Sequence, residues 1–165
     1  MWTIGIKSGL VTILGLIAYG QVVQLMGLQY SLWGNLGPVV LALGIYSGHY
    51  YYKAANSGLM TYRQGLKLGL VIVSFVGLVN ALPVYLYTKF MDASFIAQLA
   101  ESIQKALHQT AIDETFTTKA VQLIQHMTPE FLLVGIFVST VLLGFACTLI
   151  IAAFSKHSKK TPQQP

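Results

Sequence analysis

Residues 131–154, FLLVGIFVSTVLLGFACTLIIAAF, form a run of 24 residues without a charged side chain. A helix needs about 20 mostly apolar residues to cross the hydrocarbon core of a bilayer. The whole chain is 55% hydrophobic and only 9% charged, whereas a soluble domain carries about 25% charged residues. Because lipid offers no partners for backbone N–H and C=O groups, an uncharged run of this length must be helical. The sequence therefore predicts an all-α integral membrane protein.

Three further apolar segments precede this run. We predict a four-transmembrane-helix bundle with spans at about residues 4–28, 36–52, 64–88 and 131–154. The second segment is short and needs the tyrosines at 50–52 to lie in the membrane interface, where Tyr and Trp are favoured. Ala18 and Gly20 resemble a signal-peptide cleavage site, but the apolar run continues to Leu28, which favours a retained anchor. Residues 1–155 are expected to form one transmembrane domain, followed by a short basic tail at 156–165.

A less apolar segment, at about residues 90–128, separates the third and fourth predicted spans. Apolar residues recur in it at helical spacing, with polar residues between them, which predicts an amphipathic helical hairpin. Thr128, Pro129 and Glu130 then form a helix start, because Thr caps, Pro suits the first turn and Glu complements the positive helix end. Two interpretations of the hairpin stay open: a structured connector, or a docking surface or lid.

The basic residues predict the orientation of the spans. Four spans place both termini and the second loop on one side of the membrane. That side carries seven basic residues and no acidic residue: Lys7, Lys53, Arg63, Lys67, Lys156, Lys159 and Lys160. The other side carries Lys89, Lys105 and Lys119 together with all five acidic residues. Because Lys and Arg accumulate in cytoplasmic loops, both termini should be cytoplasmic, with the seven basic residues as anchors.

A short sequence occurs twice. GIKSGLV at residues 5–11 and GLKLGLV at 65–71 agree at five of seven positions, and both precede long apolar runs. This similarity indicates either two parallel hairpins from an internal duplication or chance. Small residues four apart let helices approach closely, and such pairs occur in all four predicted spans: Gly5 and Gly9, Gly44 and Gly48, Gly65 and Gly69, and Gly135 and Ser139. These faces either hold the bundle together or join protomers.

Polar side chains at membrane depth are few. Asn80 lies past the middle of the third predicted span, and Pro83 follows three residues later. A proline inside a helix removes a backbone hydrogen bond and kinks the helix. Asn80 therefore either contributes to a small polar cavity or forms an interhelical hydrogen bond, and the second interpretation is favoured.

Residues for catalysis or metal binding are sparse. His126 and Glu130 stand four apart, and His108 precedes Asp113 and Glu114, but such pairs alone are a weak metal signal. His49, in SGHYYYK, is expected at the cytoplasmic interface. Cys147 lies inside an apolar run that keeps its thiol protonated. With no nucleophile elbow, P-loop, Rossmann fingerprint or zincin motif, we expect no enzymatic activity, cofactor, metal or nucleic-acid partner.

The opening GIKSGLV, the segment SGLMTYRQGLKLGL before the third span, and the basic ending SKHSKK resemble domain-of-unknown-function family 4199. The resemblance covers nearly the whole chain. It implies a four-span bacterial inner-membrane protein and brings no catalytic or binding residues. We therefore expect a non-enzymatic accessory or oligomeric membrane subunit, whose partners are the lipid bilayer and either further copies or another membrane protein. The alternative is a component of an oligomeric transporter or channel.

Overall fold

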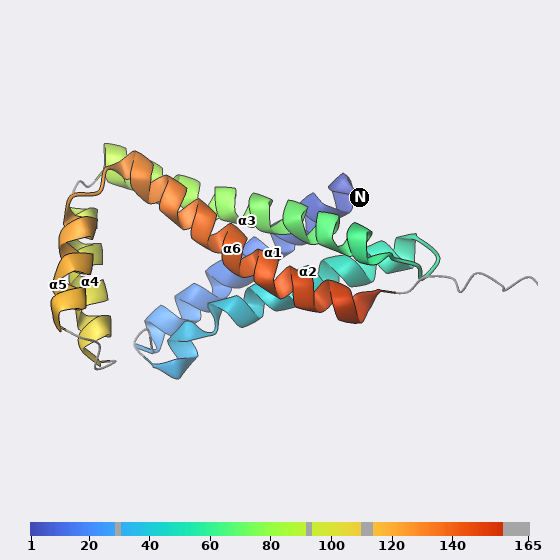
Figure 1. Ribbon diagram of the computed structural model, residues 1–165, viewed down its shortest axis with the longest axis horizontal. Coiled ribbons are helices and arrows are strands. Elements are labelled where there is room, and N and C mark those ends of the chain that lie inside the picture. Colours follow the sequence, from blue (N-terminus) through green and yellow to red (C-terminus); the bar gives the residue numbers. More distant parts are fainter. Residues whose placement is uncertain (29–30, 92–93, 110–113, 157–165) are drawn as a thin grey trace, which may run out of the picture. The chain divides into compact units, whose positions relative to one another are not determined.

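The computed structural model describes residues 1–28, 31–91, 94–109 and 114–156, and every regular element among them is helical. The elements are α1 (Trp2–Leu25), the 3₁₀ helix η1 (Leu32–Asn35), α2 (Gly37–Ala55), α3 (Tyr62–Phe90), α4 (Phe95–Gln109), α5 (Glu114–Gln125) and α6 (Pro129–Ser155) (Figure 1). The predicted all-α fold is thus confirmed for the described residues. Of the predicted basic tail at residues 156–165, only Lys156 is among the described residues.

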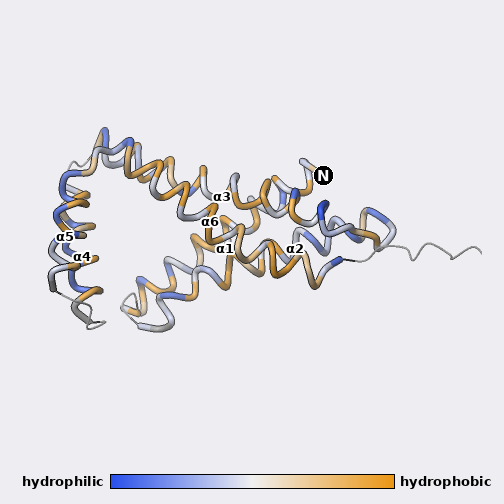
Figure 2. The backbone as a smooth tube through the Cα atoms, in the orientation of Figure 1, coloured by the Kyte–Doolittle hydropathy of each residue, from blue (hydrophilic) through white to orange (hydrophobic). Residues whose placement is uncertain are grey.

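Three of the helices are long and apolar enough to cross a membrane: α1, α3 and α6. Figure 2 shows their apolar character along the backbone. The second predicted span corresponds to α2, which has 19 residues. It is not among the three, because its last part carries His49, three tyrosines and Lys53 and so lowers its hydropathy.

Local signals explain where these helices begin and end. At the start of α3, the Thr61 backbone N–H donates to Gln64 Oε1 at 2.9 Å, and the Gln64 N–H donates to Thr61 Oγ1 at 3.3 Å. This reciprocal pair is a capping box. At the end of α2, Gly58 has a φ of +77° and its N–H donates to the Lys53 carbonyl at 2.8 Å. The left-handed residue Ser57, with a φ of +52°, comes directly after the C-cap Asn56, so the helix ends at Ala55 and the Gly58 N–H closes its last turn.

The start of α6 follows the predicted pattern. Pro129 is its first residue, and the Phe131 N–H donates to Thr128 Oγ1 at 3.3 Å. Pro83, by contrast, lies inside α3, which continues past it to Phe90.

Chain contacts divide the protein into two compact units. Unit 1 comprises residues 1–79 and 138–165, and unit 2 comprises residues 80–137. The first part of α3 and the last part of α6 therefore belong to unit 1. Its core is an apolar cluster of buried side chains from α1, α2 and α3: Ile13, Leu41, Ile45, Leu68, Ile72, Val73 and Val76.

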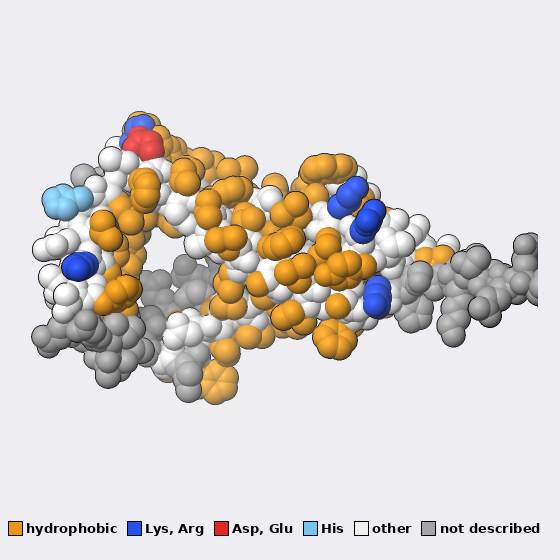
Figure 3. All heavy atoms as spheres, viewed as in Figure 1, with side chains coloured by type: hydrophobic (Ala, Val, Ile, Leu, Met, Phe, Trp, Pro, Cys, Tyr) orange, Lys and Arg blue, Asp and Glu red, His pale blue; other side chains and the backbone are white. Residues whose placement is uncertain are grey.

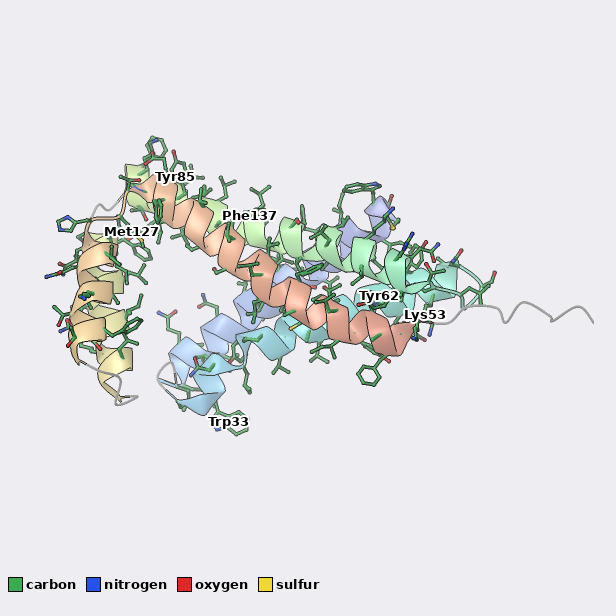
Figure 4. The ribbon with its side chains drawn as sticks, in the orientation of Figure 1. Trp33, Lys53, Tyr62, Tyr85, Met127 and Phe137 are labelled. Atoms are coloured by element: carbon green, nitrogen blue, oxygen red, sulfur yellow. The ribbon has the colours of Figure 1, made fainter. Side chains whose placement is uncertain are left out.

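Unit 1 has two distinct ends. The start of α1, the end of α2, the start of α3 and the end of α6 lie together at one of them (Figure 1). Lys53 and Tyr62 lie at this end, and Trp33 lies at the opposite one (Figure 4). Trp33 and Lys53 therefore mark opposite ends of α2 and its preceding turn.

Unit 2 contains a helical hairpin. α4 and α5 pack against each other, and the buried side chains of the two helices are Ala100, Thr117 and Val121. The Phe95 ring meets the Tyr87 ring edge-on, with centroids 5.6 Å apart, which fixes the start of α4 against the end of α3. The helical character predicted for this segment is thus present at residues 95–109 and 114–125, while its amphipathic placement at a membrane stays a prediction.

Candidate functional site: glycine-mediated helix contacts and an adjoining groove

The predicted small residues of unit 1 lie where helices approach most closely. A Cβ atom placed on Gly5 would lie 2.7 Å from Val71 Cγ1, and one on Gly9 would lie 2.8 Å from Phe75 Cδ1. These two glycines of α1 therefore face α3. Only glycine leaves room for the neighbouring side chain at such a distance.

The second copy of the repeat faces a different helix. A Cβ on Gly65 would lie 3.1 Å from Ala152 Cβ, and one on Gly69 would overlap the side chain of Thr148. Both contacts are with α6. The burial pattern is nevertheless shared, since the two glycines and the residue before the second glycine are buried in both copies, and each lysine is exposed.

The glycines of α2 receive side chains from α1 and α3. A Cβ on Gly44 would overlap Thr12, and one on Gly48 would lie 2.5 Å from Ile72 Cδ1 and 3.2 Å from Ser8 Cβ. In α6, the equivalent role falls to Gly144, where a Cβ would overlap Val73.

The fourth predicted pair behaves differently. Gly135 has no atom within 4 Å of an added Cβ, and both Gly135 and Ser139 are exposed. The first three predicted pairs thus lie at helix contacts inside unit 1, whereas the fourth lies on an exposed face of α6.

Hydroxyl side chains fill the spaces that two of the glycines leave, Thr12 at Gly44 and Thr148 at Gly69. Thr12 Oγ1 donates to the Ser8 carbonyl at 2.7 Å, and Thr148 Oγ1 donates to the Gly144 carbonyl at 2.8 Å. Each threonine thereby satisfies its hydroxyl group within its own helix, while its side chain packs on the glycine of the neighbouring helix. The signal that could have revealed them is a lone threonine on the buried face of an apolar helix.

His49 is the largest departure from the sequence interpretation. An interfacial position was expected, but the ring is fully buried. Its Nε2 lies 3.1 Å from the Gly65 carbonyl oxygen of α3, and Nδ1 has no partner. In the neutral tautomer with the proton on Nε2, this nitrogen donates to the carbonyl oxygen and Nδ1 is a buried acceptor. His49 therefore connects α2 to the second glycine repeat.

A groove lies beside the contact between α1 and α2. Its volume is about 400 Å³. One wall consists of Ile4, Lys7, Ser8 and Val11 of α1, and the other of Ser47, Tyr51 and Ala55 of α2. The lining residues of α2 are four apart, and those of α1 form two pairs four apart, Ile4 with Ser8 and Lys7 with Val11, so each wall is one helix face.

The basic anchors gather at the same end of unit 1. Figure 3 shows Lys and Arg side chains grouped there, on a surface that is otherwise largely apolar. Unit 1 contains no Asp or Glu in its sequence, because all five acidic residues lie between positions 92 and 130. No carboxylate of unit 1 can therefore neutralise Lys7, Lys53, Arg63, Lys67 or Lys156.

Charged pairs occur in unit 2. Lys89 Nζ lies 2.9 Å from Glu130 Oε1 and also donates to the Tyr85 hydroxyl at 2.6 Å. In α4, Lys105 Nζ lies 2.7 Å from Glu101 Oε1. The hydrogen bond from Lys105, helped by its positive charge, lowers the pKa of the Glu101 carboxyl below its ordinary value. Both pairs are solvent-exposed, so their contribution to stability is small.

The remaining candidates are not brought together into a site. Among the described residues, no three His, Cys, Asp or Glu side chains are grouped closely enough to hold a metal ion. Glu130 pairs with Lys89, and Asp113 and the His108 and Glu114 side chains lie outside the described residues. Asn80 and Pro83 are both exposed on α3, and the polar cavity or interhelical hydrogen bond at Asn80 stays a prediction.

Three apolar helices of membrane length and a core of apolar side chains between packed helices define the class of the chain as an all-α membrane protein. A family model matches residues 3–157, and its description is protein of unknown function (DUF4199). The chain belongs to this family, as its motifs predicted. No curated protein and no solved structure matches the chain.

Proposed function

We propose that this protein is a non-enzymatic multi-pass subunit of the bacterial inner membrane, which acts by assembling with further membrane helices. In this proposal α1, α2, α3 and α6 are the four spans and both termini are cytoplasmic. The partner is either a second copy of the chain or another membrane protein. The observation that carries the proposal is the position of Asn80.

The exposed amide of Asn80 lies in an apolar stretch of α3, between the exposed side chains of Leu78 and Leu82. An amide facing hydrocarbon without a partner costs free energy, because lipid offers it no hydrogen bond. Polar side chains at membrane depth relieve that cost by bonding to another helix. An exposed Asn80 therefore favours a neighbouring helix from outside this chain.

The exposed face of α6 supports the same proposal. α6 is the most apolar of the three membrane-length helices, and most of its surface is not covered by the protein. The space beside Gly135 is open, so another helix can approach its backbone closely.

The distribution of charge supports the proposed orientation. The end of unit 1 that carries the basic residues contains no acidic residue, as cytoplasmic ends of membrane proteins do. α2 has 19 residues, which give it a length of roughly 28 Å, close to the roughly 30 Å of a bilayer core. With α2 as a span, α4 and α5 lie outside the cytoplasm, with their apolar stripes available to the membrane interface.

The polar groups in the core of unit 1 support a structural rather than catalytic use. Thr12, Thr148 and His49 all engage backbone carbonyl oxygens of their own or neighbouring helices. The two threonine hydroxyls are satisfied inside their own helices, and His49 Nε2 links α2 to α3, which supports a structural use of all three side chains.

The test is the assembly state of the full chain, extracted gently from its host membrane and measured by native mass spectrometry. We expect a defined complex, either a homo-oligomer or a complex with one other membrane protein. Asn80→Leu should weaken that complex, Asn80→Gln should largely retain it, and Leu78→Ala, at a neighbouring exposed position, is the control. A wild-type chain that stays monomeric and without a companion at all concentrations would contradict the proposal.

The alternative, a component of an oligomeric transporter or channel, draws on the same amide. In a ring of copies, the faces that carry Asn80 and Pro83 would line a central path. Vesicles reconstituted with a homo-oligomer should then conduct a solute, and Asn80→Leu should change that flux. A homo-oligomer that carries no ion or small metabolite excludes this alternative.

A further inference from the structure

We infer that the groove between α1 and α2 binds one anionic phospholipid, with the phosphate on Lys7 and an acyl chain along the groove. The inference uses only the membrane placement in the proposed function. It does not depend on whether the protein assembles with other helices.

The shape of the groove suits a chain-like apolar ligand. From Ile4 to Val11 and from Ser47 to Ala55 the walls extend for roughly 10–12 Å, at 1.5 Å per residue. The volume, about 400 Å³, lies within the range of about 300–1,000 Å³ typical of ligand pockets. Its lining is mostly carbon, from Ile4, Val11, Ala55 and the Tyr51 ring.

The contact between the two helices limits the groove on one side. α1 and α2 meet where Thr12 packs on Gly44 and Ser8 packs on Gly48. Ser8 is buried, and the Ser47 hydroxyl donates to the Gly44 carbonyl at 2.8 Å. The inner edge of the groove is thus made of packed residues whose positions are fixed by the helix contact.

Charge selects the headgroup. Lys7 lines the groove, and no carboxylate exists in unit 1 to pair with it. Among the described residues, four more basic side chains belong to the same unit, at Lys53, Arg63, Lys67 and Lys156. A phosphate without a compensating choline or ethanolamine cation complements this charge, and clustered Lys and Arg beside a membrane attract anionic lipids.

The depth of the groove matches a lipid headgroup. Tyr51 is 60% exposed and Tyr50 is 63% exposed, and tyrosines favour the level of the headgroups. Lys7 can extend its stem along apolar surface and hold its ammonium group at the same level. A phospholipid seated here would have its phosphate beside Lys7 and its chain directed toward the bilayer core.

The sequence itself supplies the matched control. Lys67 occupies the position of Lys7 in the second repeat and is also exposed, but it does not line the groove. Lys7→Gln and Lys67→Gln therefore remove the same charge from equivalent repeat positions, and only the first removes it from the groove. Ala55→Phe fills the groove at an exposed position without changing any charge.

The experiment is native mass spectrometry of the full chain in detergent, with phosphatidylglycerol or phosphatidylcholine added. We expect one phosphatidylglycerol to bind at least about fivefold more tightly than phosphatidylcholine, the preference that one lysine confers near a membrane surface. Lys7→Gln should abolish this preference, and Lys7→Arg and Lys67→Gln should keep it. Ala55→Phe should reduce binding of both lipids.

Several outcomes would overturn the inference. These are equal binding of the two lipids to the wild type, equal loss of preference in the Lys7→Gln and Lys67→Gln variants, or unchanged binding to Ala55→Phe. Displacement of phosphatidylglycerol by millimolar inorganic phosphate would reveal a simple anion site. Occupation of the groove by a second copy would appear as a dimer lost in Ala55→Phe, and would also contradict a lipid site.

Discussion

The segments 5–11 and 65–71 agree at five of seven positions and have nearly the same burial pattern, yet they pack against different helices. The glycines of the first segment face Val71 and Phe75 of α3. The glycines of the second face Ala152 and Thr148 of α6, and its first carbonyl also faces His49 of α2. The comparison teaches that a repeated sequence determines which helix face is buried, whereas the neighbouring side chains determine how much change that face tolerates.

The two neighbours differ in stiffness. Phe75 presents the edge of a ring that can turn about its side-chain bonds to admit a small addition. Thr148 is β-branched, which restricts its χ1 angle, and its hydroxyl is held by the Gly144 carbonyl. Of the two second glycines, Gly69 should therefore tolerate a side chain less well than Gly9.

The largest expected effect is that of Gly69→Ala. Alanine has a helix propensity up to about 1 kcal/mol better than glycine, but the new Cβ overlaps Thr148, and overpacking costs about 1–3 kcal/mol. The clash should prevail and lower the unfolding temperature of the protein in nanodiscs. Thr148→Ala in the same chain should restore much of the loss, and Gly20→Ala, where nothing lies within 4 Å, is the control.

His49→Leu should have the next largest effect and sharpens the comparison, because the first repeat has no histidine partner. It removes a hydrogen bond of about 1 kcal/mol to the Gly65 carbonyl while keeping an apolar side chain of similar size. Thermal unfolding should report a loss of about that size. A neutral result would show that the contact with Gly65 adds nothing to the stability of the second repeat.

Gly9→Ala should change stability by less than either variant. The added Cβ would lie 2.8 Å from Phe75 Cδ1, and a small turn of the ring relieves that contact. Alanine's gain of up to about 1 kcal/mol in helix propensity offsets the remainder. If Gly9→Ala destabilises the protein as much as Gly69→Ala, the two repeats are equivalent and the proposed difference in stiffness is wrong.

The smallest effect is expected at the two lysines. Lys7 and Lys67 are both exposed, and surface substitutions usually change stability by less than about 0.5 kcal/mol. Lys7→Gln and Lys67→Gln should therefore unfold at the wild-type temperature in neutral lipid. A much lower unfolding temperature in only one variant would mean that its lysine stabilises a helix contact. The two repeats would then differ in their structural role as well as in lipid binding.

Much of the fold was predictable because it depends on local chemistry. The uncharged run before Phe154 predicts a membrane-length helix, and Thr128 with Pro129 predicts where that helix begins. Small residues four apart predict close approach, since removing side chains is the only way to bring helix axes together. The hairpin at 90–128 was visible as helical spacing.

The partners of each face were not predictable. Helical periodicity identifies a face but not the helix that covers it, so the sequence could not tell that Gly69 receives Thr148 and Gly9 receives Phe75. His49 was expected at the interface because neighbouring tyrosines are amphipathic, yet Gly65 leaves room for its ring in the core. The exposure of Asn80 depends in the same way on what the rest of the chain covers.

The contact between Gly69 and Thr148 also bears on how the protein is made. The helix that packs against the second repeat, α6, is synthesised after α3, whereas the first repeat can meet α3 as soon as α3 is inserted. Until α6 arrives, the glycine face of α3 must be occupied by lipid, by an insertion factor or by another subunit. Because α6 is made after α3, the stiffer contact, between Gly69 and Thr148, forms later than the contact between Gly9 and Phe75.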